Sequence, residues 1–122
     1  MYSIMKDVRG IVLLETIKTL QKNKRAFKLM FAVGEFDMVI ADSDSLTCEI
    51  FEIKHTDRVY EAQYKNLVNE EKCQDAEFEY GTITRKVVHY RGERQEINGI
   101  QYLNVVDYLE NLNYSKKSDS LA

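Results

Sequence analysis

The sequence contains no apolar run near the roughly 20 residues that would cross a membrane. It contains no proline, no internal repeat and no low-complexity segment. Its first residues lack the basic segment and apolar stretch of a secretion signal. We therefore expect a cytoplasmic protein with no membrane partner. Its 122 residues, 44% hydrophobic and 30% charged, suit one ordinary folded domain with one core.

Cysteine is scarce, and its spacing argues against a zinc site. Cys48 and Cys73 are far apart and form no Cys-x-x-Cys unit. Combined with His55 and His89 they match no familiar zinc pattern, and strand alternation places Cys48 and His55 on opposite faces. We expect reduced, partly buried thiols instead.

A surplus of basic charge is also missing. The net charge is −3 and the isoelectric point is about 5.4, which argues against a protein that coats nucleic acid. This net charge is compatible with an enzyme that contacts DNA locally, because catalytic carboxylates make the net charge of such an enzyme more negative. The two local basic clusters are Lys22, Lys24, Arg25 and Lys28, and then Arg85, Lys86, Arg91 and Arg94. For each cluster we favour a solvated loop or strand edge, and the alternative is a weak nucleic-acid contact.

Hydrophobic periodicity and turn residues predict an α/β protein of the α+β type, with a mixed central sheet flanked by helices in the order αβββαββα. The expected helices span residues 6–21, 58–71 and 105–112, and the expected strands span 26–32, 35–42, 47–55, 82–90 and 100–103. Residues 1–112 form the single domain, and 113–122 are expected to be a flexible tail.

The predicted hairpin of residues 35–55 carries the most informative pattern. Its register, counted from the loop at Asp44-Ser45, pairs Ala41 with Cys48, Val39 with Ile50, Asp37 with Glu52 and Glu35 with Lys54 on one face, and Met38 with Phe51 and Phe36 with Ile53 on the other. A slip of one residue would set charged groups against apolar ones, so the register is well determined. Two directly opposed carboxylates repel each other. Asp37 and Glu52 are therefore expected to share a cation.

The first helix adds a third acid. Glu15 shares a helical arc with Val8, Ile11 and Val12. A glutamate on an apolar face suggests a buried ligand, because charged groups are seldom buried without a partner. The alternative is a residue at the rim of the core that reaches water.

This set of groups suits metal-dependent hydrolysis of a phosphodiester. The expected Mg²⁺ ligands are Asp37, Glu52, Glu15 and the backbone carbonyl of Ile53. Lys54 would orient the attacking water or stabilise negative charge. Glu35 and Gln63 are expected to support the site, Gln63 by positioning substrate or lysine. The competing interpretation is a surface ion network on a solvated sheet face.

At these residues the chain resembles the PD-(D/E)XK nuclease superfamily, and more closely the C-terminal domain of a family of bacterial and archaeal AAA-type ATPases of unassigned role. The stretches that carry the resemblance are residues 34–40, 50–55, 80–83, 88–92 and 99–105, and it covers residues 8–112. It implies a restriction-endonuclease-like fold. By this resemblance, Glu15, Asp37, Glu52 and Lys54 occupy the acidic-helix, acidic-strand and Glu-x-Lys positions. Gln63 stands where related nucleases place a glutamine four residues before a tyrosine, which is Leu67 here.

The resemblance implies a nuclease-like domain that hydrolyses DNA with Mg²⁺ or Mn²⁺, and two copies that pair to cut both strands. The sequence contains no Gly-x-x-x-x-Gly-Lys-[Ser/Thr] run and hence no ATP site of that type. The ATPase domain would lie in the same chain or in a partner chain. The alternative is a catalytically inactive module that keeps the nuclease fold and binds protein or DNA in the service of an ATPase.

Overall fold

The computed structural model describes residues 8–112, and the predicted tail at 113–122 lies outside this range. The elements, in chain order, are α1 (Val8–Thr19), β1 (Lys24–Met30), β2 (Glu35–Asp42), β3 (Thr47–Ile53), the short 3₁₀ helix η1 (Glu61–Gln63), α2 (Glu70–Tyr80), β4 (Thr82–Tyr90), β5 (Gln95–Ile97) and β6 (Ile100–Asn104). Residues 105–112 are helical. No described helix is long and apolar enough to cross a membrane.

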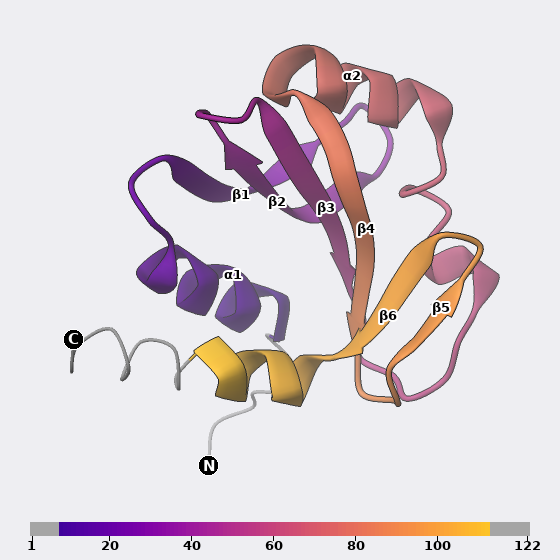
Figure 1. Ribbon diagram of the computed structural model, residues 1–122. Coiled ribbons are helices and arrows are strands. Elements are labelled where there is room, and N and C mark those ends of the chain that lie inside the picture. Colours follow the sequence, from indigo (N-terminus) through magenta and orange to yellow (C-terminus); the bar gives the residue numbers. More distant parts are fainter. Residues whose placement is uncertain (1–7, 113–122) are drawn as a thin grey trace, which may run out of the picture.

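The six strands form one mixed sheet in the order β1-β2-β3-β4-β6-β5. The first three strands are antiparallel, β3, β4 and β6 run parallel, and β5 returns antiparallel to β6. Helices lie against both faces of this sheet (Figure 1). The predicted α+β class, with a mixed sheet flanked by helices, is confirmed, and it is consistent with a nuclease-like architecture.

Apolar side chains fill both sides of the sheet. The cluster on the α2 side is built on Val39, Ile50, Leu67, Val88 and Tyr102, and the cluster on the α1 side on Val12, Met38, Phe51, Val87 and Val105. In this strand order β3 and β4 lie in the middle of the sheet. Residues on both faces of these two strands are buried. The site described below lies where β2 and β3 leave this core.

A β-bulge changes one predicted face. Along the β1–β2 ladder, Phe27 pairs with Val39 and Leu29 with Phe36, so β2 advances three residues while β1 advances two. The extra residue turns Phe36 into the α2-side cluster. The prediction that Phe36 shares a face with Met38 and packs on Ile53 is therefore wrong, since those two belong to the other cluster.

The helix predicted at residues 58–71 is also wrong. Only the three residues of η1 are helical in the first part of that range, and α2 begins at Glu70. The Thr56 hydroxyl makes a local turn by accepting from the Arg58 N–H at 3.2 Å. Asn69 caps the helix, and its side chain accepts from the Lys72 N–H. The stronger cap lies later in the chain, with acidic residues directly after it.

The short strand β5 was not predicted, because residues 91–98 are polar and resemble a turn. Asn98 and Gly99 adopt positive φ angles of 51° and 82°, and they join β5 to β6 as a tight hairpin. Turn chemistry, rather than hydrophobic periodicity, specifies this pairing. The predicted bounds of β2 and β4 are confirmed, while β1 begins at Lys24 and β3 ends at Ile53.

Candidate functional site

Asp37 and Glu52 lie side by side where the β2–β3 ladder ends. The Met38–Phe51 pair follows the predicted register, but it is the last regular pair, and the described ladder does not continue to the predicted pairs of Asp37 with Glu52 and of Glu35 with Lys54. Beyond it, the Asp37 N–H donates to Glu52 Oε1 at 3.0 Å, and Asp37 Oδ2 accepts from the Ile53 N–H at 2.7 Å. Side-chain carboxylates thus replace ladder carbonyls next to the bulge. Asp37 is 3% exposed and Glu52 is 2% exposed, so both are buried carboxylates with backbone partners.

Glu35 adds a third carboxylate to this group. Burial, the hydrogen bond to Glu35 and the nearby Glu52 charge raise the pKa of Asp37 to about 7, although the Ile53 N–H opposes the rise. The same hydrogen bond from Asp37 lowers the pKa of Glu35. Burial raises the pKa of Glu52, which Lys54 and the Asp37 N–H oppose. Below about pH 7 the Asp37 carboxyl therefore keeps a proton, which it donates to the ionised Glu35.

Each carboxylate has a cationic neighbour. Arg9 Nη1 lies 3.7 Å from Asp37 Oδ1, Lys28 Nζ 3.7 Å from Glu35 Oε2, and Lys54 Nζ 3.8 Å from Glu52 Oε2. The cations are far more exposed than the acids: the Arg9 side chain is 60% exposed and that of Asp37 is 2%. The acids lie deep and the positive charges lie outside them, an arrangement that suits an anion arriving from solvent.

Two further polar residues reach the site from the segment after β3. Asn66 Nδ2 donates to Glu52 Oε2 at 3.3 Å, and Asn66 Oδ1 accepts from Lys72 Nζ at 2.9 Å. A Cβ on Gly34 would come within 3.0 Å of Asn66 Oδ1 and 3.2 Å of Lys72 Nζ. The turn between β1 and β2 therefore packs directly on this amide–ammonium pair. Together with Arg9, these are the site residues that sequence reasoning missed, because only the tertiary fold brings Arg9 to Asp37 and the Asn66–Lys72 pair to Glu52.

The structure does not bring Glu15 to the carboxylates. Glu15 Oε2 pairs with Lys18 Nζ at 3.1 Å, one turn along the same helix. Its side chain is 32% exposed, which matches the alternative of a residue at the rim of the core. The residue of α1 that contacts Asp37 is Arg9, so this helix supplies a cation where an acid was expected.

Gln63 is buried, but its hydrogen bonds lie within the protein. Its Oε1 accepts from the Tyr60 N–H at 2.7 Å and from the Tyr102 hydroxyl at 3.0 Å, and its Nε2 donates to the Arg58 carbonyl at 2.8 Å. The bonds to Tyr60 and Arg58 order the segment around η1, and the bond from Tyr102 holds this segment against β6. No described hydrogen bond connects Gln63 to Lys54, so the geometry gives it a structural part.

The basic clusters do not form one surface. Lys28 belongs to the carboxylate site, whereas Lys24 pairs with Asp42 at the far end of β2 from Glu35. The remaining predicted contacts have other neighbours: Arg25 lies over the Phe27 and Tyr80 rings, Arg85 binds Glu49 and Gln101, Lys86 interacts with Cys73, and Lys22 is exposed before β1. Around the acids, Arg9 and Lys54 supply the positive charge that the sequence clusters were expected to provide.

The donor atoms of the site suit a hard divalent cation. Asp37, Glu52 and Glu35 offer only oxygen, and burial is the main reason why the pKa values of the first two are raised, so a cation beside them would stabilise their charged forms. Among residues 8–112, no group of three or more His, Cys, Asp or Glu side chains forms a metal cluster. Mg²⁺ commonly binds through one or two carboxylates and keeps several waters. The residues that could hold such an ion are Asp37 and Glu52, and the Ile53 carbonyl is the further ligand that the sequence predicts.

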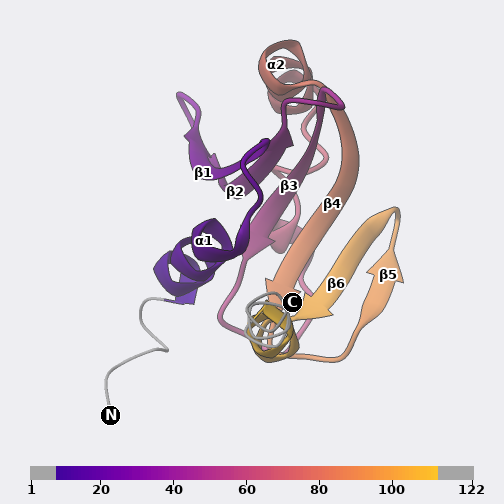
Figure 2. The same cartoon turned by 60° about the vertical axis from the view of Figure 1, so that its left-hand side comes forward.

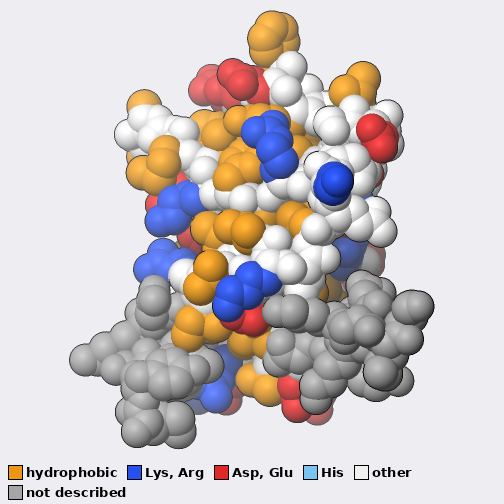
Figure 3. Space-filling model, turned by 90° about the vertical axis from the view of Figure 1, so that its left-hand side faces the viewer, with side chains coloured by type: hydrophobic (Ala, Val, Ile, Leu, Met, Phe, Trp, Pro, Cys, Tyr) orange, Lys and Arg blue, Asp and Glu red, His pale blue; other side chains and the backbone are white. Residues whose placement is uncertain are grey.

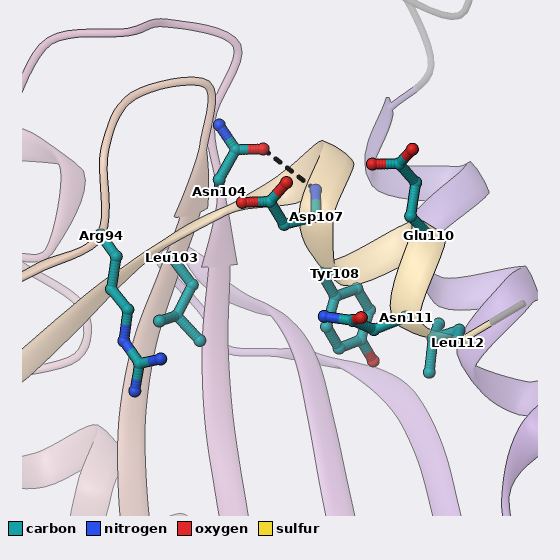
Figure 4. A pocket seen from close by; sticks show the side chains of 8 residues that line it. All are labelled: Arg94, Leu103, Asn104, Asp107, Tyr108, Glu110, Asn111 and Leu112. Carbon is teal, nitrogen blue, oxygen red and sulfur yellow. Dashed lines mark hydrogen bonds between the residues drawn. The ribbon is translucent and has the colours of Figure 1, made fainter. Parts of the chain in front are cut away.

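A separate pocket of about 440 Å³ lies beside residues 105–112 (Figure 4). Its lining includes Arg94, Leu103 and Tyr108, and it shares no residue with the carboxylate site. Asn104 lies at its edge and caps the last helical segment by accepting from the Asp107 N–H at 3.0 Å. We assign no chemistry to this pocket.

Comparisons of the chain with protein-family models, with curated proteins and with solved structures found no match. The functional argument therefore depends on the geometry of the carboxylate site.

Proposed function

We propose that this chain is a Mg²⁺-dependent nuclease-like domain that hydrolyses DNA phosphodiester bonds, and that it serves as the C-terminal module of an AAA-type ATPase. The observation that carries the proposal is the buried pair of Asp37 and Glu52 at the bulge, with Lys54 on the same site. The ATPase partner and the pairing of two copies follow from the resemblance in the sequence.

The acids are held ready for a cation. Asp37 is fixed by the Ile53 N–H, and Glu52 by the Asp37 N–H and the Asn66 amide. Preorganised ligands lose little entropy when the metal binds. When bound there, Mg²⁺ would polarise the phosphate and activate a water molecule. Because Asp37 must lose its proton to bind, metal affinity should rise as the pH passes about 7.

The cations can hold the phosphate. Arg9 and Lys28 lie outside the acids with exposed side chains. A phosphodiester bound between them would replace their contacts at 3.7 Å to carboxylates with closer, charge-assisted hydrogen bonds. Lys54, at 30% exposure, lies between the buried Glu52 and solvent. Its ammonium group is the one to stabilise charge that develops on the phosphate oxygens.

A second candidate function has its own supporting observation. Arg9, Lys28 and Lys54 already neutralise the three carboxylates by charge. A site balanced in this way folds without a metal, as a catalytically inactive module that binds protein or DNA would. The two functions differ in whether the acids bind a cation and whether DNA is cut.

The experiment is a cleavage assay on supercoiled and linear DNA at pH 8, with Mg²⁺, with Mn²⁺ or with EDTA. We expect nicking that requires the metal and falls by at least about a hundredfold in Lys54→Met and Asp37→Asn, the scale of a lost catalytic group. The matched control is Lys65→Met, an exposed lysine with no contact to the acids. An intact plasmid under every condition, together with no thermal shift on adding Mg²⁺, would assign the inactive module.

A further inference from the structure

Two hydrogen bonds in series connect helix α2 with the carboxylate of Glu52. Asn66 Nδ2 donates to Glu52 Oε2 at 3.3 Å, and Lys72 Nζ donates to Asn66 Oδ1 at 2.9 Å. Figure 2 shows α2 at the end of the sheet where β3 and β4 begin, whereas Glu52 lies next to the last residue of β3. Lys72, in the first turn of α2, therefore reaches Glu52 only through the Asn66 amide.

The two neighbours of the Asn66 amide select one orientation of it. An ionised carboxylate only accepts hydrogen bonds and an ammonium group only donates them, whereas an amide does both. The NH₂ group of Asn66 faces Glu52, and its oxygen faces Lys72. A flipped amide would set oxygen against carboxylate and NH₂ against ammonium. The charge of Lys72 therefore favours the orientation in which Asn66 donates to Glu52.

The bond from Lys72 is the closer of the two. Its length of 2.9 Å is typical of an N–H···O bond, whereas the 3.3 Å bond to Glu52 exceeds the usual range of about 2.7–3.2 Å. Without Lys72 the amide would keep only the longer bond and could turn toward water. The position of Asn66 therefore depends on Lys72.

The Lys72 ammonium group is itself held in place. It lies 5.7 Å from the centre of the Phe31 ring, a distance at which an aromatic face attracts a cation. A Cβ on Gly34 would come within 3.2 Å of it, so the turn between β1 and β2 packs on it. Lys72 is half-buried, whereas Figure 3 shows Lys and Arg side chains standing separately on the surface that carries α1 and β1. Lys72 is therefore placed to act on Asn66 rather than to bind a phosphate in solvent.

We propose that Lys72 is a positioning residue of the carboxylate site and that it acts on Glu52 through the Asn66 amide. The Asp37 N–H holds Glu52 Oε1, and Asn66 holds Oε2. A carboxylate oxygen has two lone pairs, so Oε2 keeps one for a cation while Asn66 fixes its direction. Lys54 differs, because it approaches Glu52 directly at 3.8 Å. The inference rests on the proposed function for the cation, but not for the orientation of the amide.

The central test is a double-mutant cycle on Mn²⁺ binding by the full chain, measured by calorimetry at pH 8. Lys72→Met removes the charge and keeps the length of the side chain, and Asn66→Leu removes both hydrogen bonds and keeps a branched side chain of similar size. Each should weaken Mn²⁺ binding about tenfold, as expected for groups that orient a metal ligand. Because Lys72 acts through Asn66, the double variant should also bind about tenfold more weakly, whereas independent effects would multiply to about a hundredfold.

Two further variants separate the positioning effect from a general effect of charge. Lys72→Arg keeps a charged donor for the Asn66 oxygen and should restore most of the affinity that Lys72→Met loses. The matched control is Lys65→Met, which removes an exposed lysine one residue before Asn66. It should bind Mn²⁺ as wild type does.

A second readout needs neither metal nor DNA. In the NMR spectrum of the metal-free protein, the two side-chain amide protons of Asn66 should resonate far apart, because only one of them is donated to a carboxylate. Their signals are assigned by their absence in Asn66→Leu. We expect the separation to shrink in Lys72→Met and to persist in Lys72→Arg and Lys65→Met.

Three results would overturn the proposal. One is a Lys72→Met protein with wild-type Mn²⁺ affinity, another is a double variant whose two losses multiply, and the third is an Asn66 amide signal that Lys72→Met leaves unchanged. Weaker DNA binding by Lys72→Met in EDTA, with unchanged Mn²⁺ affinity, would assign Lys72 to the phosphate instead. A wild-type protein that binds no Mn²⁺ would refute the proposed function, and the amide signals would then decide whether Lys72 positions Asn66.

Discussion

Replacing Asp37 with asparagine should make the protein more stable at alkaline pH. The raised pKa of about 7 means that the folded state keeps a proton on this carboxyl that the unfolded chain releases near pH 4. Folded molecules therefore bind more protons than unfolded ones between about pH 4 and pH 7, so the wild-type free energy of unfolding falls as the pH rises through this window. Asparagine can accept from the Ile53 N–H and donate to Glu35, and it does not titrate.

The magnitude follows from the shift. A displacement of about 3 pKa units corresponds to about 4 kcal/mol, at about 1.4 kcal/mol per unit. The pKa of Glu35 moves in the opposite direction because it shares the proton, which offsets part of this loss. We expect Asp37→Asn to gain about 2 kcal/mol relative to wild type between pH 4 and pH 8.

The assay is urea unfolding of both proteins at intervals across this pH range, without divalent cations. Asp44→Asn, at an exposed loop position, is the control and should show no such trend. A difference between Asp37→Asn and wild type that stays constant from pH 4 to pH 8 would refute the assigned proton and its cause. Adding Mg²⁺ at pH 8 should then stabilise wild type but not Asp37→Asn.

Three other substitutions test the surroundings of the site. Gly34→Ala should cost about 1–2 kcal/mol in urea unfolding, because Gly34 has a φ of 85° and the new Cβ would press on Asn66 and Lys72; an unchanged free energy of unfolding would contradict the packing. Gln63→Leu should cost about 1–3 kcal/mol and speed hydrogen exchange in residues 54–69, whereas a purely substrate-positioning role predicts lost cleavage with normal stability. Glu15→Gln should change stability by less than about 0.5 kcal/mol and leave metal binding intact; loss of metal affinity would restore Glu15 as a ligand.

The register of the β2–β3 hairpin could be predicted from the sequence, because apolar residues alternate on both faces of its strands. Val39 and Ile50 on one face and Met38 and Phe51 on the other allow one register only. The bulge at Asp37 was not predictable, because it depends on how β2 pairs with β1. Hydrophobic periodicity alone does not determine that pairing. The bulge nevertheless determines how the Asp37 N–H and carboxylate exchange hydrogen bonds with β3.

The surroundings of the acids were harder to predict, because they come from segments without regular structure or from side chains that could point either way. Asn66 was expected inside a helix, but it lies in the segment before α2 and binds Glu52. Arg9 and Glu15 are both charged residues of α1, and helical periodicity favoured the acid. Only the crossing of the helix over the sheet decides that the arginine meets Asp37.

The most direct test of the account is a crystal soaked in Mn²⁺ at pH 8, above the pKa of Asp37, and measured for anomalous scattering. We predict a single strong peak bridging the Asp37 and Glu52 carboxylates, which disappears in Asp37→Asn. An empty site with Arg9 and Lys54 still paired to the acids would contradict the metal-dependent chemistry.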